Sequence, residues 1–332
     1  MGSLLALLSS ALWGAADFFG GKLSKKYAPI VVLGMTQAIG LLFGITLVLL
    51  TGELFGSNPP NAFGDGGYFF AGAIAGVMGY IGLICLYAGL STGRMGVVSP
   101  ISALSAVIPL TVALVSGEVL TRNQGIGVVI ALAGAFCASG PELSQGLSPK
   151  PILLALGAAA GFGTALTFMS IGSESSALMT MVMMRATTFI FTIALVIKFR
   201  NVGKFEKSEI PVLVFIGVSD FLANLLLGAA TNFGLVSLVM VLGSLYPVVT
   251  ALLAFKFLNE RLHRVQYVGI ALAVAGVETI VTCNDIPGID NFGVFIEDQP
   301  VLARGKVRYV GEAIAAVAAT LLAVLSWAIV RF

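Results

Sequence analysis

The chain has 332 residues, of which 58% are hydrophobic and only 10% are charged, and its mean hydropathy is +1.02. Soluble domains carry about one quarter charged residues, so a water-soluble globule is excluded. A net charge of +2 is too small a surplus to indicate a nucleic-acid partner. Cys85, Cys137 and Cys283 show no metal-ligand spacing, so we expect no metal site, no disulfide framework and no cofactor.

Apolar runs of membrane-spanning length follow one another along the chain. A hydrocarbon core about 30 Å thick needs about 20 helical residues to cross it, because lipid does not satisfy free backbone groups. In chain order the runs are 3–21, 29–50, 68–90, 95–117, 123–140, 150–171, 176–197, 210–232, 235–257 and 264–282. Barrel strands would be about ten residues long and alternate in polarity, which these runs do not. The sequence therefore predicts an all-α integral membrane protein with ten transmembrane helices.

The second half of the chain repeats the first. With a shift of 142 residues, eight of the seventeen positions in 118–134 are identical to their counterparts in 260–276. A unit of five helices is odd in number, so consecutive copies must insert with opposite orientation, and a cavity is expected between them near the midplane. We predict a first repeat over 1–140, an inverted second repeat over 141–283 and a separate tail over 284–332.

Several motifs resemble a known family. Residues 244–250 (Ser-Leu-Tyr-Pro-Val-Val-Thr), 259–262 (Asn-Glu-Arg-Leu) and 266–276 resemble the second repeat of EamA-type proteins of the drug/metabolite transporter superfamily. Residues 13–21, which begin Trp-Gly and end Asp-Phe-Phe-Gly-Gly, resemble its first helix. The resemblance covers about 3–282 and implies a ten-helix secondary transporter, commonly an exporter of amino acids or similar small metabolites.

Ionisable side chains inside apolar spans are the main candidates for a substrate or ion pathway. An ionised group at the centre of a membrane helix costs about 2.5–3.5 kcal/mol on insertion scales, so each needs a partner or a wet cavity. Arg185 and Asp220 each lie about ten residues into consecutive spans. They could form a structural ion pair. Alternatively, Arg185 binds an anionic group such as a carboxylate, while Asp220 senses protons or receives a substrate amine.

Four further residues extend this candidate pathway. Gln37 occupies the second-helix position that matches Arg185 under a shift of 148 residues, and Asn224 follows Asp220 by one helical turn. Asp17 lies late in the first span, where it either lines the cavity or reaches the interface beside Lys22. Tyr246 could present its hydroxyl to the cavity or pack against lipid.

Prolines mark the fourth and ninth spans. Pro100, Pro109 and Pro247 each remove a backbone hydrogen bond and can kink the helix toward a cavity, so these two helices are expected to line the cavity or to move. Glu118 and Glu260 end the same two spans, four residues before Arg122 and Arg264. This spacing favours a local ion pair at each junction.

The energy source and the orientation follow from what the loops contain. The sequence has no phosphate-binding Gly-x4-Gly-Lys-Ser/Thr loop, so transport is driven by a gradient, with protons as the candidate coupling ion, or is passive. Loops after odd-numbered spans hold twelve basic residues, whereas loops after even-numbered spans hold only Arg122. The positive-inside rule then places the amino terminus outside, while the family resemblance implies cytoplasmic termini. The expected location is the bacterial inner membrane.

The tail differs in composition from the rest of the chain. Residues 285–319 resemble a segment of the xanthine dehydrogenase and aldehyde oxidase family of molybdenum hydroxylases, which points to a gene fusion. The segment is too short to hold a molybdenum cofactor, and we expect no enzyme activity. Residues 313–330 are apolar and long enough for an eleventh span, although their start lies inside the enzyme-like segment.

The main hypothesis is a transporter of small polar metabolites, amino acids or drug-like compounds that works by alternating access, with the lipid bilayer as its environment. One alternative is a membrane-anchored accessory component or remnant of a molybdenum hydroxylase, whose tail docks to a partner enzyme. Another is a lipid-linked sugar flippase, which would need a lateral opening to lipid.

Overall fold

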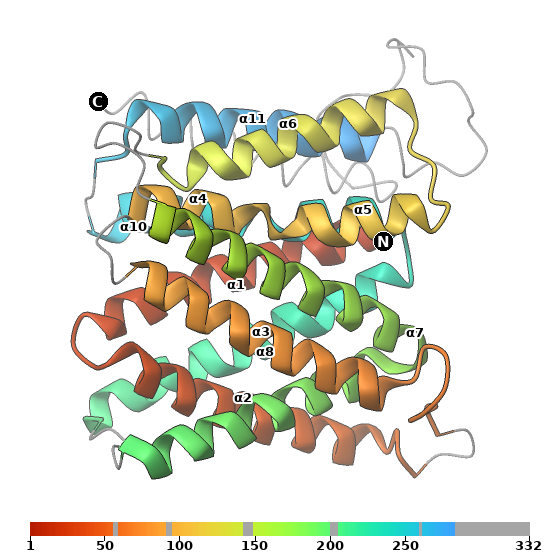
Figure 1. Ribbon diagram of the computed structural model, residues 1–332, viewed down its shortest axis with the longest axis vertical. Coiled ribbons are helices and arrows are strands. Elements are labelled where there is room, and N and C mark those ends of the chain that lie inside the picture. The colour runs from red at the N-terminus through yellow and green to blue at the C-terminus, as the bar shows by residue number, and fades with distance from the viewer. Residues whose placement is uncertain (56–58, 91–94, 142–148, 200–204, 259–260, 283–332) are drawn as a thin grey trace, which may run out of the picture.

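The computed structural model describes residues 1–332 except 56–58, 91–94, 142–148, 200–204, 259–260 and 283–332. Within the described residues all regular structure is helical, and the helices lie side by side (Figure 1). Eight helical segments in this part of the chain are long and apolar enough to cross a membrane. The tail 284–332, with its apolar run 313–330, and Glu260 lie outside the described residues.

The first three helices begin and end close to the expected spans. They are α1 (Gly2–Ser24), α2 (Pro29–Thr51) and α3 (Tyr68–Leu90). Proline at the start of α2 costs no hydrogen bond, because the first amides of a helix have no partner within it. The helix stops at Gly52, whose φ of 64° lies in the left-handed region that glycine adopts without strain.

The fourth span is broken at its centre. It consists of α4 (Met95–Ala103), the 3-10 turn η1 (Leu104–Ala106) and α5 (Val107–Val115). The ring of Pro109 crowds the carbonyl four residues earlier, which belongs to Ser105 inside η1. Helix α4 continues through Pro100 without interruption.

Two helices follow the broken span. Helix α6 (Arg122–Ala138) begins with a capping box, in which Thr121 and Gln124 exchange hydrogen bonds between side chain and backbone. Helix α7 (Pro149–Phe199) contains one non-helical residue, Ser176, with φ −162° and ψ 117°. The Oγ of Ser176 accepts a hydrogen bond from the amide of Met179 at 2.9 Å and so caps the helix that follows. The long helix therefore has two parts, 149–175 and 177–199.

The second half ends with another broken span. After η2 (Lys207–Glu209) come α8 (Ile210–Thr231), α9 (Val236–Gly243), α10 (Tyr246–Leu258) and α11 (Arg264–Thr282). The break between α9 and α10 again lies four residues before a proline, since Gly243 is the carbonyl that Pro247 crowds.

Glu118 does not form the local ion pair that its spacing suggests. Its carboxylate accepts hydrogen bonds from the backbone amides of Val236 at 2.7 Å and Ser237 at 3.0 Å, and among the described residues it has no ion pair with Arg122. The first amides of a helix lack partners and carry partial positive charge, so α9 competes successfully for the carboxylate. Glu118 thus ties the end of the fourth span to the start of the ninth.

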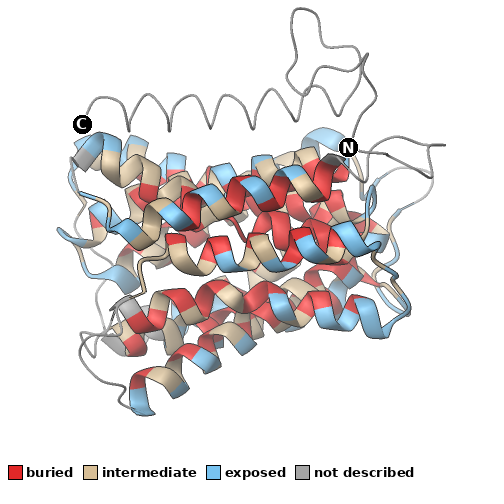
Figure 2. Ribbon diagram, turned by 90° about the horizontal axis from the view of Figure 1, so that it is seen from above, coloured by how far each residue is buried: buried red, intermediate tan, exposed pale blue. Residues whose placement is uncertain are grey.

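Buried residues face the centre of the bundle, and exposed apolar residues face outward (Figure 2). Met169, Phe221 and Met240 are fully buried, whereas Leu50 is 77% exposed and Val115 is 83% exposed. Large apolar side chains on the outer surface suit lipid rather than water. In the packing, α6 lies against α11, α3 against α7, and α1 against α8.

Candidate functional site

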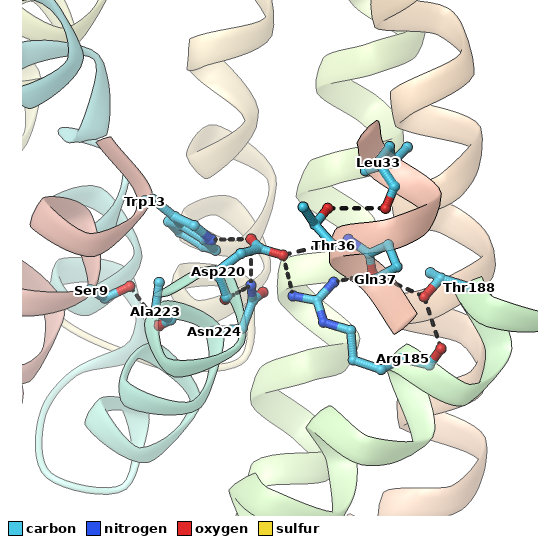
Figure 3. A network of polar contacts seen from close by, with 10 residues as sticks. All are labelled: Ser9, Trp13, Leu33, Thr36, Gln37, Arg185, Thr188, Asp220, Ala223 and Asn224. Atoms are coloured by element: carbon cyan, nitrogen blue, oxygen red, sulfur yellow. Dashed lines mark hydrogen bonds and ion pairs between the residues drawn. The ribbon is translucent and has the colours of Figure 1, made fainter. Parts of the chain in front are cut away.

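An ion pair joins α7 to α8 among the packed helices (Figure 3). Arg185, on the second part of α7, places its Nη2 atom 2.8 Å from Oδ2 of Asp220 on α8. Nη2 is fully buried, and apart from this ion pair it has no hydrogen-bond partner among the described residues. The pairing is what an apolar interior requires, because an isolated charge there is costly.

Gln37 on α2 connects the two charged groups. Its Oε1 accepts hydrogen bonds from Nη1 of Arg185 at 2.7 Å and from the hydroxyl of Thr188 at 3.1 Å. Its Nε2 donates a long hydrogen bond of 3.5 Å to Oδ2 of Asp220. The amide is buried, so its orientation is set by these three partners.

Asp220 receives further donors from the opposite side. Nε1 of Trp13 on α1 donates to Oδ1 at 3.1 Å, and Nδ2 of Asn224 contacts the same oxygen at 3.4 Å and the Asp220 carbonyl at 2.8 Å. The side chain of Asp220 is 27% exposed, against 5% for Arg185. The carboxylate therefore reaches an accessible space, and the guanidinium lies behind it.

Asp17 lies one turn after Trp13 on the same face of α1. Its side chain is exposed, although the residue lies among protein atoms deep in the bundle. Its carboxylate is close enough to Asp220 and to the phenols of Tyr87 and Tyr246 for electrostatic interaction. Residues of α1, α3, α8 and α10 thus surround Asp17, and the accessible space beside the Asp17 and Asp220 carboxylates is called the hollow below.

Two aromatic rings define one wall of this hollow. Trp13 and Tyr246 meet edge to face, with ring centroids 6.1 Å apart and an interplanar angle of 74°. Such a T-shaped arrangement directs a ring edge at a ring face, which is the favoured geometry for aromatic pairs. Thr250, one turn after Tyr246, donates to the carbonyl of Gly14 at 3.1 Å and helps to fix α10 against α1.

The structure brings together most of the polar residues predicted from the sequence. Gln37, Arg185, Asp220 and Asn224 share one network, and Asp17 and Tyr246 flank it. Pro109 and Pro247 lie beside the two helix breaks rather than in the network.

Sequence reasoning missed Trp13, Tyr87 and Thr188. Trp13 stands four residues before Asp17 and Thr188 stands three residues after Arg185. Helical spacing from the charged residues could have identified these two. Nothing in the sequence distinguishes Tyr87 from other aromatic residues of the spans.

The geometry bears directly on the two hypotheses for Arg185. Because Nη2 is fully buried and faces Asp220, a ligand carboxylate cannot reach it unless Asp220 moves away. Of the three charged groups, the carboxylates of Asp17 and Asp220 are accessible to a ligand. No group of three or more metal-ligating side chains occurs in the described part of the chain.

A family model for EamA-like transporters matches residues 1–140 and 149–282. The chain belongs to the EamA-like transporter family. It is therefore a multi-pass membrane protein of a family whose members are transporters of the drug/metabolite type and not enzymes. Family membership implies a small-molecule substrate and a lipid environment.

Two further comparisons concern the transporter part. The chain is 27% identical over 126 residues to an uncharacterized protein of Methanocaldococcus jannaschii, a match that covers 38% of this chain and 92% of that protein. A crystal structure of a protein superposes with a TM-score of 0.67 at 18% identity, covering 84% of this chain and 95% of the other. At this identity the likeness shows the fold alone.

The end of the chain resembles different proteins. A model for the a/b hammerhead domain of aldehyde oxidase and xanthine dehydrogenase matches residues 263–324, which overlaps α11. One of the probable xanthine dehydrogenase subunits of Bacillus subtilis is 61% identical over 44 residues. The nicotinate dehydrogenase large molybdopterin subunit of Eubacterium barkeri is 49% identical over 49 residues. These matches cover only 6% and 12% of the two enzymes' lengths.

Proposed function

We propose that the protein is a secondary transporter that exports a small polar metabolite, amino acid or drug-like compound by alternating access. The observation that carries this proposal is the charged network of Arg185, Asp220 and Asp17 inside the bundle. Charged groups in membrane helices are costly and usually mark substrate or ion pathways. Here two of the three are accessible from the hollow between α1, α3, α8 and α10.

We propose ten transmembrane helices. The break at Ser176 divides the 51 residues of α7 into two stretches that are each long enough to cross the bilayer. The segments α4, η1 and α5 form one broken span, and α9 with α10 forms another. Helix α6 has 17 residues and is only slightly shorter than a usual span.

Two inverted repeats, 1–140 and 141–283, account for the packing of α6 against α11. Gly134 lies against Ala273, and Gly276 lies against Ala131, so closely that a Cβ atom on either glycine would clash. The shift of 142 residues converts one pair into the other. The pairs run in opposite directions along the two helices, as a two-fold axis in the membrane plane requires.

Other features support the same arrangement. The breaks in the fourth and ninth spans lie at corresponding positions of the two halves, and discontinuous helices at such positions are typical of transporter binding sites. The relative from Methanocaldococcus jannaschii is about as long as one repeat, since 126 matched residues make up 92% of it.

Labelling of engineered cysteines tests the inverted repeats. The exposed residues Asp65 and Ser208 lie in the connections after the second and seventh spans, which an inverted repeat places on opposite sides of the membrane. In a chain freed of its native cysteines, an impermeant thiol reagent should modify Asp65→Cys only from outside and Ser208→Cys only from inside. Modification of both from the same side would overturn the inverted arrangement.

Transport is tested in proteoliposomes that contain the full chain. Efflux of a defined mixture of amino acids and amine compounds is measured by mass spectrometry, with and without a proton gradient. Arg185→Ala and Asp220→Asn should abolish an efflux that the control Asp65→Asn retains, because only the first two disturb the central network. Normal efflux from both network variants would show that this site is not the pathway.

The tail supports a second candidate function, as an accessory component of a molybdenum hydroxylase. The observation in its favour is the match of residues 263–324 to the hammerhead domain. Because the matched segments are 44 and 49 residues long, we favour a fusion in which the tail is dispensable for transport.

A further inference from the structure

The Asp17 carboxylate is a charged group of the hollow that lacks a partner among the described residues. Among the described residues it has no hydrogen bond and no ion pair, although its neighbour Asp220 has several. Lys22, the nearest base on α1, is exposed and lies five residues later on another face of the helix. An intramembrane carboxylate without a counter-ion is costly, so a cation at this position would be stabilised.

The charges around Asp17 do not balance. The guanidinium of Arg185 is matched by Asp220 at 2.8 Å, and no other base of the described residues lies in the network. Counting Arg185 with Asp17 and Asp220 leaves one negative charge. Its repulsion with Asp220 makes the surroundings of Asp17 still more favourable for a cation.

Aromatic rings complete these surroundings. Trp13 and Tyr246 form the edge-to-face pair beside Asp17, and the phenol of Tyr87 is within electrostatic range of the same carboxylate. The faces of tryptophan and tyrosine attract cations, and such rings with a carboxylate suit an ammonium group that carries an apolar body.

The site does not favour an anionic ligand. In the described part of the network the fixed cation is Arg185, whose Nη2 is fully buried behind Asp220 and whose Nη1 is taken by Gln37 at 2.7 Å. An anionic ligand in the hollow would meet two carboxylates before it reached this guanidinium.

We propose that the hollow bounded by Asp17, Trp13, Tyr87 and Tyr246 binds an organic cation, with Asp17 as its counter-ion and the rings around its ammonium group. This substrate class rests on the proposed function, because it takes the hollow to be the transport pathway. It replaces the hypothesis in which Arg185 receives a substrate carboxylate.

Equilibrium binding of benzyltrimethylammonium tests the proposal. The compound carries a permanent positive charge and one aromatic ring, so it cannot gain or lose a proton. We would measure binding of its radiolabelled form to the purified full chain in lipid nanodiscs, with unlabelled benzyltrimethylammonium, benzyl alcohol and phenylacetate as competitors. Only the unlabelled cation should displace the label from wild-type protein. Displacement by phenylacetate at the same concentrations, or no binding of the cation, would overturn the proposal.

Two variants locate the binding group. Asp17→Asn should weaken binding at least about tenfold, since one lost charge-assisted contact of about 1.4 kcal/mol corresponds to a factor of ten. Asp65→Asn removes an exposed carboxylate far from the hollow and should bind as wild type does. Unchanged affinity of Asp17→Asn would overturn the assignment. If this variant does not fold, the comparison of competitors on wild-type protein still decides whether the site prefers cations.

The binding measurement can fail or succeed independently of the transport assay. Binding in nanodiscs needs no gradient and no movement across a membrane. A protein that binds the cation without efflux contradicts the proposed function and leaves the binding site intact. Efflux of anionic compounds without cation binding contradicts only the substrate class.

Discussion

Gln37 holds the guanidinium of Arg185 and the carboxylate of Asp220 in one arrangement. It carries no charge, yet it contacts three side chains of the other half of the chain. It could be predicted from the sequence because it occupies the second-helix position that matches Arg185 under a shift of 148 residues. Its partner Thr188 follows Arg185 by three residues, so helical spacing could have pointed to it, but hydroxyl groups are common in membrane helices and usually bond to their own backbone.

Gln37→Leu should destabilise the protein. The substitution leaves Nη1 of Arg185 without its partner, and a buried donor that loses its partner costs about 1–3 kcal/mol. A lower thermal unfolding midpoint in detergent would show this. Thr46→Val on the exposed face of the same helix is the control and should change stability by less than about 0.5 kcal/mol. Equal midpoints for the two variants would mean that the network adds no stability.

The two members of the ion pair should respond unequally to removal. Asp220→Leu leaves a guanidinium that is only 5% exposed without its counter-charge, whereas Arg185→Leu leaves a carboxylate that is 27% exposed and still has Trp13 as donor. Breaking a buried pair costs about 3–5 kcal/mol, so Asp220→Leu should lower the free energy of unfolding most.

The double variant Asp220→Leu/Arg185→Leu should recover part of that loss, because no uncompensated charge remains. Chemical denaturation of all three variants in one detergent ranks their free energies of unfolding. A larger loss for Arg185→Leu than for Asp220→Leu would contradict the burial difference.

At the scale of the helix, hydropathy predicted most boundaries to within a few residues. The spans 68–90 and 264–282 coincide with α3 and α11, because charged or turn-forming residues bound them. The α7 break was expected as a loop over 172–175, but the helix continues to Ser176 and bends at that residue. The breaks in the fourth and ninth spans depend on which carbonyl each proline crowds, and hydropathy contains no such information.

Glu118 provides a test of contact between helices. Replacing it with alanine removes two charge-assisted hydrogen bonds to the first amides of α9, which should cost about 1–2 kcal/mol. The thermal unfolding midpoint should fall accordingly. Val119→Ala, at a neighbouring position that is 83% exposed, should not change it. If both variants unfold at the wild-type temperature, the cap does not contribute to stability.

A surface cluster joins the α1–α2 connection to the α7–α8 connection. Lys26 forms ion pairs with Glu206 at 3.0 Å and with Glu209 at 3.1 Å, and the rings of Tyr27 and Phe205 lie 4.7 Å apart beside it. The hydrogen bond from the Lys26 ammonium holds the pKa of the Glu206 carboxyl below its usual value of 4.5. Hydrogen bonds to both carboxylates raise the pKa of Lys26.

This cluster should stabilise the protein in a pH-dependent way. A lowered carboxyl pKa adds stability that is complete above pH 4.5 and is lost as the pH falls through the lowered value. Wild type should therefore unfold at a higher temperature than Glu206→Gln near neutral pH, and the gap should close in acid. Because these groups are exposed, high salt should also close the gap. A gap that persists in acid or in high salt would exclude this ion pair as its cause.

At the scale of the whole molecule, the chain joins a transporter to a segment of another kind. Deleting residues 284–332 should leave efflux from proteoliposomes unchanged, because the family match ends at residue 282. The comparison needs the full chain and the truncated chain at equal density in the same lipid. Loss of efflux with unchanged folding would favour a functional role for the tail.

The packing of α6 against α11 has a consequence for the direction of transport. In the proposed inverted arrangement, equivalent glycine and alanine residues line both sides of this contact, so its packing energy is the same in either orientation of the protein in the membrane. This contact therefore does not favour opening toward either side of the membrane. In that arrangement, a preference for opening to one side must originate in residues that differ from their counterparts in the other half. Asp17 and Asp220 are such residues, as are Gln37 and Arg185, which occupy matching positions but differ in charge.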